Sequence, residues 1–202
     1  MAIATYTDLL ARVADWLGRS DLTNRIPEFV TLAQARINRQ VRAKAMETKT
    51  TSFSITAEYV AVPTDFLQVK HFYINSPAPR KTLEPMESGL MTDTYTTSGV
   101  PKFFSVEGSE FRFSPSHSQT YTATLVYHLK PATLAAGSQE TNTLFPANAD
   151  LYLYATLLEA VACIGDHPNV GLWKQGYEEA LANLNSQSGG WRHGGPLMTR
   201  PG

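Results

Sequence analysis

The chain has 202 residues, of which 43% are hydrophobic and 17% are charged, and its formal net charge is −1. This balance is typical of a globular protein with one sizeable domain or two smaller layers that share a core, and it argues against a dedicated sequence-specific DNA-binding protein, which is usually basic. No signal peptide and no run of about 20 apolar residues is evident, so we expect no membrane span; the single cysteine, Cys163, excludes a disulfide framework and indicates synthesis in a reducing cytosol.

Two helices are predicted in the first quarter of the chain. Apolar residues recur at every third or fourth position over residues 5–17, and Gly18 follows them as a helix terminator. A second helix is predicted over residues 25–45, with Asn24 as its N-cap and Pro27 in its first turn.

From about Thr48 the hydrophobic period changes from that of a helix to that of a strand. The alternation predicts antiparallel strands between residues 48 and 130. The residues Glu107-Gly108-Ser109-Glu110 separate two short apolar runs and predict a β-hairpin. Residues 84–98 are expected to form a connection that has room for one short helical turn, and residues 131–147 a polar loop.

Two more helices are predicted, over residues 148–164 and 170–185, with Asn148 as a cap and Gly165 as a stop. We therefore expect an α+β fold in which N- and C-terminal helix pairs form a helical bundle with an inserted antiparallel β region. The expected domains are the bundle (1–47 and 148–185), the β region (48–147) and an extended C-terminal tail containing Gly and Pro (186–202).

A concentrated basic stretch lies at residues 35–44, "ARINRQVRAK". On a helical wheel, Arg25, Arg36, Arg39 and Arg42 cluster opposite the apolar side, so we expect them to be exposed and dispensable for folding. Three interpretations remain open for this face. It is a solvated helix surface, a contact for nucleic-acid phosphates, or an interface with an acidic protein partner.

No constellation of catalytic residues is apparent. The five histidines are scattered without metal-ligand spacing, and no nucleophile, phosphate-binding or dinucleotide motif is present. Cys163 lies on an apolar helix and is expected to be a buried small hydrophobe. We therefore predict no catalytic site, no metal, no cofactor and no enzymatic activity.

The N-terminal third resembles the head-to-tail adaptor proteins of tailed bacteriophages. The resemblance rests on Trp-Leu-x-Arg-x-Asp-Leu (16–22), Ala-x-x-x-Ile-Asn-Arg (33–39), Met46-Glu47 and Val-Pro-x-Asp-Phe-Leu (62–67). It is to the adaptors of short-tailed phages, called tail tubular protein A or gatekeeper-type adaptors. The C-terminal helices and the tail fit by their arrangement more than by their residues.

The resemblance implies a structural virion protein in the phage neck, made in the host cytoplasm. Twelve copies would form a ring under the portal protein, continue the DNA channel and dock the tail nozzle protein. A basic helix face repeated around such a ring could contact genomic DNA without reading its sequence. The alternative function is a nucleic-acid-binding module that uses the same face of the second helix.

The tail has the composition of a segment that orders on binding. Two Gly pairs flank Trp191, and apolar side chains occur beside arginines. Trp and Arg are common anchors of binding segments. Together with the resemblance, this predicts a portal-binding tail whose contact residues are Trp191, Arg192, Leu197, Met198 and Arg200.

Overall fold

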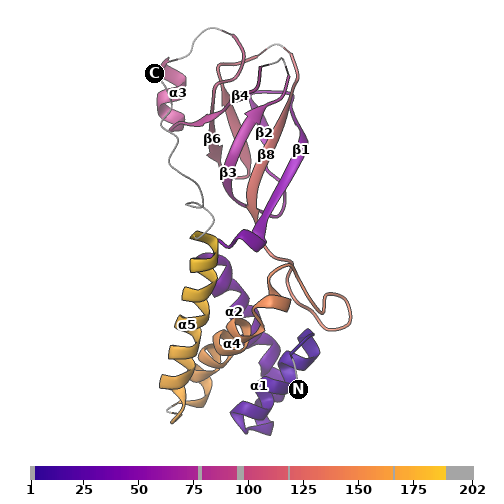
Figure 1. Cartoon of the computed structure of the whole chain (residues 1–202), viewed down its shortest axis with the longest axis vertical. Helices are drawn as coiled ribbons and strands as arrows, with labels where there is room; N and C mark the ends of the chain where they lie inside the picture. The colour runs from indigo at the N-terminus through magenta and orange to yellow at the C-terminus, as the bar shows by residue number, and fades with distance from the viewer. Residues whose placement is uncertain (1–2, 77–78, 95–97, 118, 166, 190–202) are drawn as a thin grey trace. The chain divides into compact units, whose positions relative to one another are not determined.

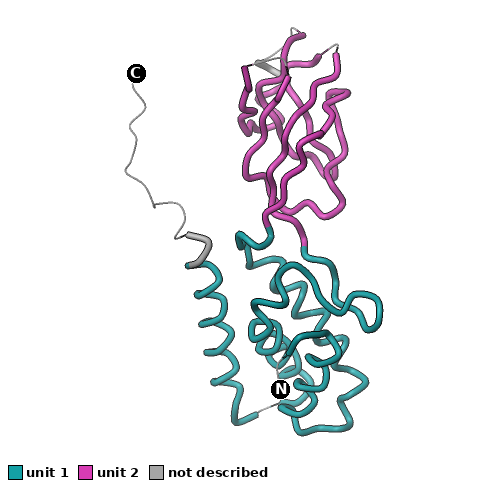
Figure 2. Tube along the Cα trace, turned by 45° about the vertical axis from the view of Figure 1, so that its right-hand side comes forward, with its two compact units in different colours: residues 1–46, 131–202 teal, residues 47–130 magenta. Residues whose placement is uncertain are grey.

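The computed structural model describes residues 3–76, 79–94, 98–117, 119–165 and 167–189 (Figure 1). The chain divides into two compact units, which Figure 2 colours separately. One unit combines Met1–Met46 with Pro131–Gly202, and the other is Glu47–Lys130. The helical unit is therefore assembled from both ends of the sequence, and the β unit is a single continuous segment.

The helical unit contains α1 (Tyr6–Leu17), α2 (Ile26–Gln40), α4 (Ala149–Ile164) and α5 (Val170–Gly189), with 3-10 helices at Ser20–Arg25, Lys44–Met46 and Phe145–Ala147. The predicted α1 is confirmed. Thr5 and Asp8 form a capping box at its start, and Gly18 ends it in the left-handed conformation, with a φ of 61°. The predicted helices at 148–164 and 170–185 are also confirmed, and α5 runs four residues further.

The second helix starts within one residue of the predicted position, but the predicted Asn24 cap and the predicted end near residue 45 are both wrong. Asn24 lies inside a 3-10 helix, and α2 starts without a side-chain cap. At the other end Val41 is extended, with a ψ of 133°. Val41 and Ala43 are both buried, and a helix would place two residues at this spacing on different sides. The chain therefore leaves the helix so that both side chains reach the core.

The central element of this unit is α4, which packs against α1, α2 and α5. Its buried residues occupy several sides of the helix, as expected for a helix covered by neighbours. Residues 131–147, expected to be a polar loop, also supply the core: Leu134, Leu144 and Phe145 are buried. The helices from the two ends of the sequence thus share one core, which the loop completes.

The described part of the β unit contains eight strands in two four-stranded sheets. The first sheet has the order β1 (Glu47–Ile55), β8 (Tyr121–Leu129), β3 (Phe66–Ile74), β4 (Lys81–Thr82), and all its pairs are antiparallel. The second has the order β2 (Tyr59–Ala61), β7 (Glu110–Ser114), β6 (Phe103–Glu107), β5 (Glu84–Pro85). A short helix, α3 (Ser88–Thr94), lies between β5 and β6 in the sequence.

The predicted fold class is therefore wrong. The protein is a mixed α/β chain with two four-stranded sheets, not a helical bundle with one inserted antiparallel β region. In addition, β5 pairs with β6 in parallel. Strands β4 and β5 have two residues each; β5 lies within residues 84–98, where a connection was predicted, and β4 lies just before it. Segments this short are too brief to show a hydrophobic period, so only their partners reveal them.

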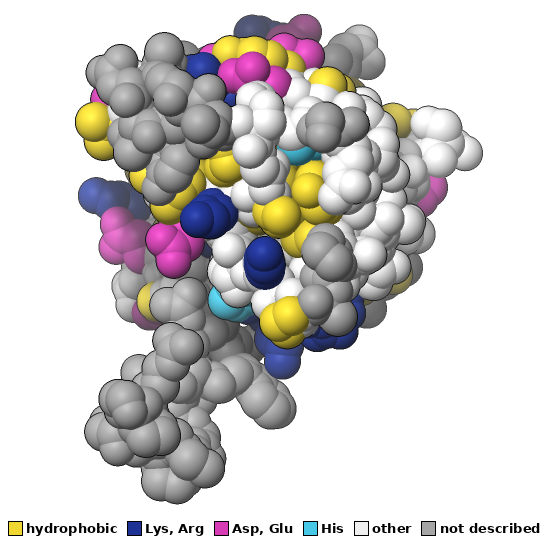
Figure 3. Space-filling view, turned by 90° about the horizontal axis from the view of Figure 1, so that it is seen from above, with side chains coloured by type: hydrophobic (Ala, Val, Ile, Leu, Met, Phe, Trp, Pro, Cys, Tyr) yellow, Lys and Arg dark blue, Asp and Glu magenta, His cyan; other side chains and the backbone are white. Residues whose placement is uncertain are grey.

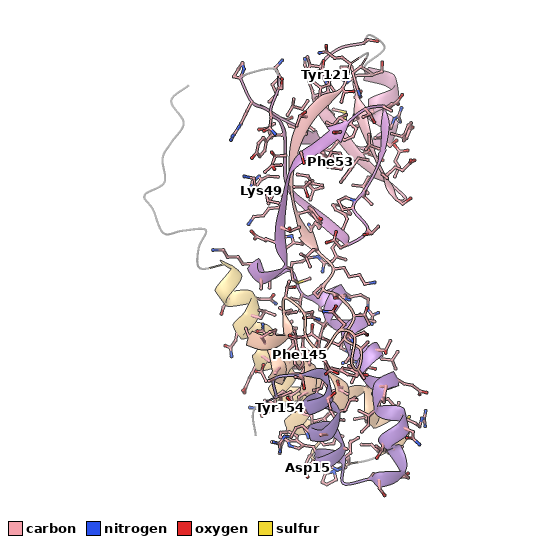
Figure 4. The ribbon with its side chains drawn as sticks, turned by 90° about the vertical axis from the view of Figure 1, so that its right-hand side faces the viewer. Asp15, Lys49, Phe53, Tyr121, Phe145 and Tyr154 are labelled. Atoms are coloured by element: carbon pink, nitrogen blue, oxygen red, sulfur yellow. The ribbon has the colours of Figure 1, made fainter. Side chains whose placement is uncertain are left out.

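Apolar side chains from both sheets form one core. Phe72 of the first sheet stacks edge to face on Phe111 of the second, with ring centroids 5.3 Å apart. Ile55, Leu125 and Phe113 are completely buried in the same cluster. Figure 4 labels Tyr121, which belongs to this cluster, and Phe53, which packs against it. The predicted hairpin is confirmed: Glu107 pairs with Glu110 around Gly108, whose φ is 60°.

Candidate interaction surfaces

The four arginines of the predicted basic face of α2 differ in their surroundings. Arg36 differs most from the prediction that these arginines are exposed, because α4 and α5 pack beside it. Its Nε lies 2.7 Å from a carboxylate oxygen of Glu159 on α4, with the two side chains 33% and 18% exposed. Its guanidinium also lies over the ring of Tyr177 on α5, 5.9 Å from the centroid. The expectation that Arg36 is exposed is therefore wrong, because the wheel contained no information on neighbouring helices.

The other three arginines are arranged differently from one another. Arg42 lies beyond the end of α2, and its guanidinium donates to the carbonyl oxygens of Asn38 and Val41 at 2.8 and 2.6 Å. Arg25 is exposed and lies 3.7 Å from Glu28. Arg39 is exposed and forms no ion pair with any residue in the described part of the chain. Arg25 and Arg39 therefore remain as exposed positive groups.

We expect Arg36 and Arg39, which both lie within α2, to differ in their contribution to the stability of the fold. Arg36→Gln should lower the free energy of unfolding by about 1–2 kcal/mol, because it leaves Glu159 partly buried without its cation. The matched variant Arg39→Gln should change it by no more than about 0.5 kcal/mol. Urea denaturation of both variants measures this difference, and equal midpoints would contradict the structural role of Arg36.

The start of α1 is held by the loop before α4. The carboxylate of Glu140 accepts hydrogen bonds from the backbone N–H groups of Gly137 and Thr7, at 2.7 and 2.9 Å. These bonds hold the pKa of Glu140 below its usual value. The Thr5 hydroxyl is the main cause that lowers the pKa of Asp8, followed by the backbone of Ala4. Two carboxylates thus anchor one helix terminus in their ionised form.

The helical unit should lose stability in acid because of these two groups. A carboxyl whose pKa is lowered by folding stabilises the folded state above its unfolded pKa, and this contribution disappears as the pH falls through the folded pKa. We expect Glu140→Gln to lower the Tm at pH 6 to 7, and the gap from the wild type to close below about pH 4. Glu178→Gln, at an exposed position of α5, is the control and should show no such convergence. A Tm gap independent of pH would contradict the assignment.

An aromatic groove lies on the helical unit, with a volume of about 590 Å³. It is lined by Trp16 of α1, Tyr154 of α4, and Leu172 and Gly176 of α5; Figure 4 labels Tyr154 among the helices. The rings of Trp16 and Tyr154 meet edge to face at 5.9 Å. A Cβ atom at position 176 would lie only 2.7 Å from the Tyr154 ring, so glycine allows the ring to lie against α5. This groove was not predicted from the sequence.

A second groove, of about 600 Å³, lies on the β unit. Strand β3 pairs with β4 only at Tyr73 and Ile74, so the earlier part of that edge faces the groove instead of another strand. Phe104 and Val106 of β6 also line this groove. An unpaired strand edge offers backbone donors and acceptors to an extended partner. On the face seen in Figure 3, uncharged polar side chains and backbone make up much of the described surface, and basic, acidic and apolar side chains lie in scattered groups.

The predicted tail residues Trp191, Arg192, Leu197, Met198 and Arg200 lie outside the described residues. Within the described ranges, no three His, Cys, Asp or Glu residues form a possible metal-binding group. Over the same ranges, no helix combines the length and hydrophobicity that a membrane span requires. Cys163 is partly buried on α4.

Comparison with known proteins gives the class of this chain. The model of the SU10 adaptor protein family matches residues 4–200, which cover both units. The chain therefore belongs to the SU10 adaptor protein family and is a structural adaptor protein of a phage, a component of the virion that interacts with other head or tail proteins. No curated protein sequence matches it.

Proposed function

We propose that this adaptor joins the phage head to the tail as a ring under the portal. Twelve copies would surround the DNA channel and present a docking surface to the tail nozzle protein, as in the tail tubular protein A or gatekeeper type of adaptor. The observation that carries the proposal is the family match over nearly the whole chain. The role is mechanical, so it requires neither catalysis nor a cofactor.

The division into two units supports such a role. Each unit has its own buried core, and each carries an apolar groove on its surface. A connector must bind a neighbouring copy and at least one different partner at the same time. In our proposal the helical unit, the β unit and the C-terminal tail provide separate contacts, with the tail lying against the portal.

The exposed arginines are better suited to a weak contact with DNA or with an acidic partner than to tight DNA binding. Arg36 and Arg42 are engaged within the chain, which leaves Arg25 and Arg39 for the channel or for an acidic partner. Two positive groups per copy would still add up around a ring. The alternative, a nucleic-acid-binding module, would need one continuous basic surface to retain DNA at physiological salt.

The direct test is to mix the purified chain with candidate portal assemblies and image the products by electron microscopy. We expect a ring of adaptor copies on the portal, formed without DNA. Binding of DNA at physiological salt, measured by fluorescence anisotropy, should be weak. Tight DNA retention combined with no portal attachment would favour the nucleic-acid-binding alternative.

A further inference from the structure

The aromatic groove leaves apolar surface exposed in the single chain. Leu172 is 66% exposed and Trp16 is 40% exposed, whereas most large apolar side chains of this unit are buried. Both residues lie beside the ring of Tyr154, so the exposed area is continuous. Apolar surface concentrated in a hollow with a few polar groups is typical of a binding site. Gln175 and Glu179 provide the polar groups here.

The same helix that lines the groove leads to the C-terminal segment. Leu172, Gly176 and Glu179 lie along one face of α5, and Asn183 and Ser186 continue that face toward Gly189. All five positions are exposed or partly exposed, and the last two carry small polar side chains. An extended segment that turned back after Gly189 could therefore lie along this face and reach the groove.

The chain beyond Gly189 is long enough to reach the groove from the end of α5. From Gly176 to the end of α5 the helix rises about 20 Å, at about 1.5 Å per residue. Leu197 lies far enough beyond Gly189 for an extended chain to span about 27 Å. Leu197 and Met198 can therefore arrive at the groove of their own chain, whereas Trp191 lies too close to Gly189 to do so.

The charges are also complementary. Residues 190–202 contain Arg192 and Arg200 and no acidic side chain. On the groove, Glu179 accepts a hydrogen bond from the neutral amide of Gln175 at 2.7 Å and pairs with no cation among the described residues. Arg200, two residues beyond Met198, would then lie near the Glu179 carboxylate at the edge of the groove.

We propose that Leu197 and Met198 occupy the groove between Trp16, Tyr154 and Leu172 of their own chain, with Arg200 near Glu179. Attachment to the same chain gives the segment a high effective concentration at the groove, which favours this arrangement over docking on a second copy. It covers apolar surface in the free chain and does not depend on the proposed ring; attachment of the same residues to the portal, as proposed above, would require the segment to leave the groove.

Paramagnetic NMR on the full chain tests this docking. A nitroxide label is attached to Gly202→Cys in a Cys163→Ala background, and broadening of the Trp16 indole and Leu172 methyl signals is measured. We expect strong broadening at these sites and little at Leu32, an exposed leucine of α2. In a mixture of labelled chains with unlabelled isotope-enriched chains, the broadening should vanish. Broadening that persists in the mixture would place the segment on a second copy and overturn the proposal.

Substitutions on each side give the control. Leu172→Asn and the double variant Leu197→Asn/Met198→Asn should each remove the broadening, because they remove the apolar contact from one partner. Leu32→Asn should leave it unchanged. Glu179→Arg should weaken it, and adding Arg200→Glu should restore it. Unchanged broadening in Leu172→Asn would refute the groove as the site, whatever the outcome of the portal experiment.

Discussion

Replacing Phe111 with alanine is expected to lower the free energy of unfolding of the β unit by about 3–5 kcal/mol. The Phe111 side chain is completely buried. Its ring lies 5.2 Å from that of Phe66 and 5.8 Å from that of Phe53, in addition to its contact with Phe72. Because these contacts join the two sheets, the substitution leaves a cavity that neither sheet can close alone.

Chemical denaturation measures the size of this loss of stability, and hydrogen exchange shows which strands are affected. Amides of β1, β3 and β7 should lose protection first. Tyr59→Ala is the matched control: Tyr59 lies on β2 next to β7, but it is 42% exposed. We expect it to cost no more than about 1 kcal/mol. An unfolding midpoint of Phe111→Ala equal to that of the wild type would contradict a core shared by the two sheets.

Replacing Asn142 with alanine is expected to destabilise the helical unit by about 2–4 kcal/mol. The side-chain oxygen of Asn142 accepts hydrogen bonds from the backbone N–H groups of Leu144 and Phe145, at 3.0 and 2.9 Å. Its amide donates to the carbonyl oxygen of Ala132 at 2.9 Å and meets the hydroxyl of Tyr152. Alanine would leave these buried polar groups without partners.

Loss of the hydrogen bond to Tyr152 is expected to be strongly destabilising, because the Tyr152 hydroxyl is buried. Burial raises the pKa of its hydroxyl to about 12, and the ring is almost completely buried. Asn183→Ala, at an exposed position of α5, is the control and should change the stability by less than about 0.5 kcal/mol. The amides of Leu144 and Phe145 should exchange faster in Asn142→Ala. If their exchange is unchanged, Asn142 does not organise this loop.

The elements of this fold that were predicted correctly depend on local interactions. The bounds of α1, the Gly18 stop and the hairpin around Gly108 were predicted correctly, because each depends on residues close together in the chain. A periodic apolar stripe or a glycine with positive φ acts over a few residues. The long strands β3 and β8 also lie within predicted alternating runs.

The interaction surfaces depended much more on tertiary contacts. Arg36 looked exposed on a single helix, and only the packing of α4 and α5 assigned it to Glu159 and Tyr177. The groove beside Tyr154 exists because Gly176, from another helix, leaves room for the ring. Neither relation appears in a window of neighbouring residues.

Most helices and longer strands, and the motifs shared with phage adaptors, can be recognised from the amino-acid sequence. The pairing of β4 and β5, the early end of α2 and the contribution of residues 131–147 to the core become visible only in the folded chain. The difference lies in the range of the interactions. Periodicity and capping act between near neighbours, whereas burial and strand pairing depend on segments that meet only when the chain folds.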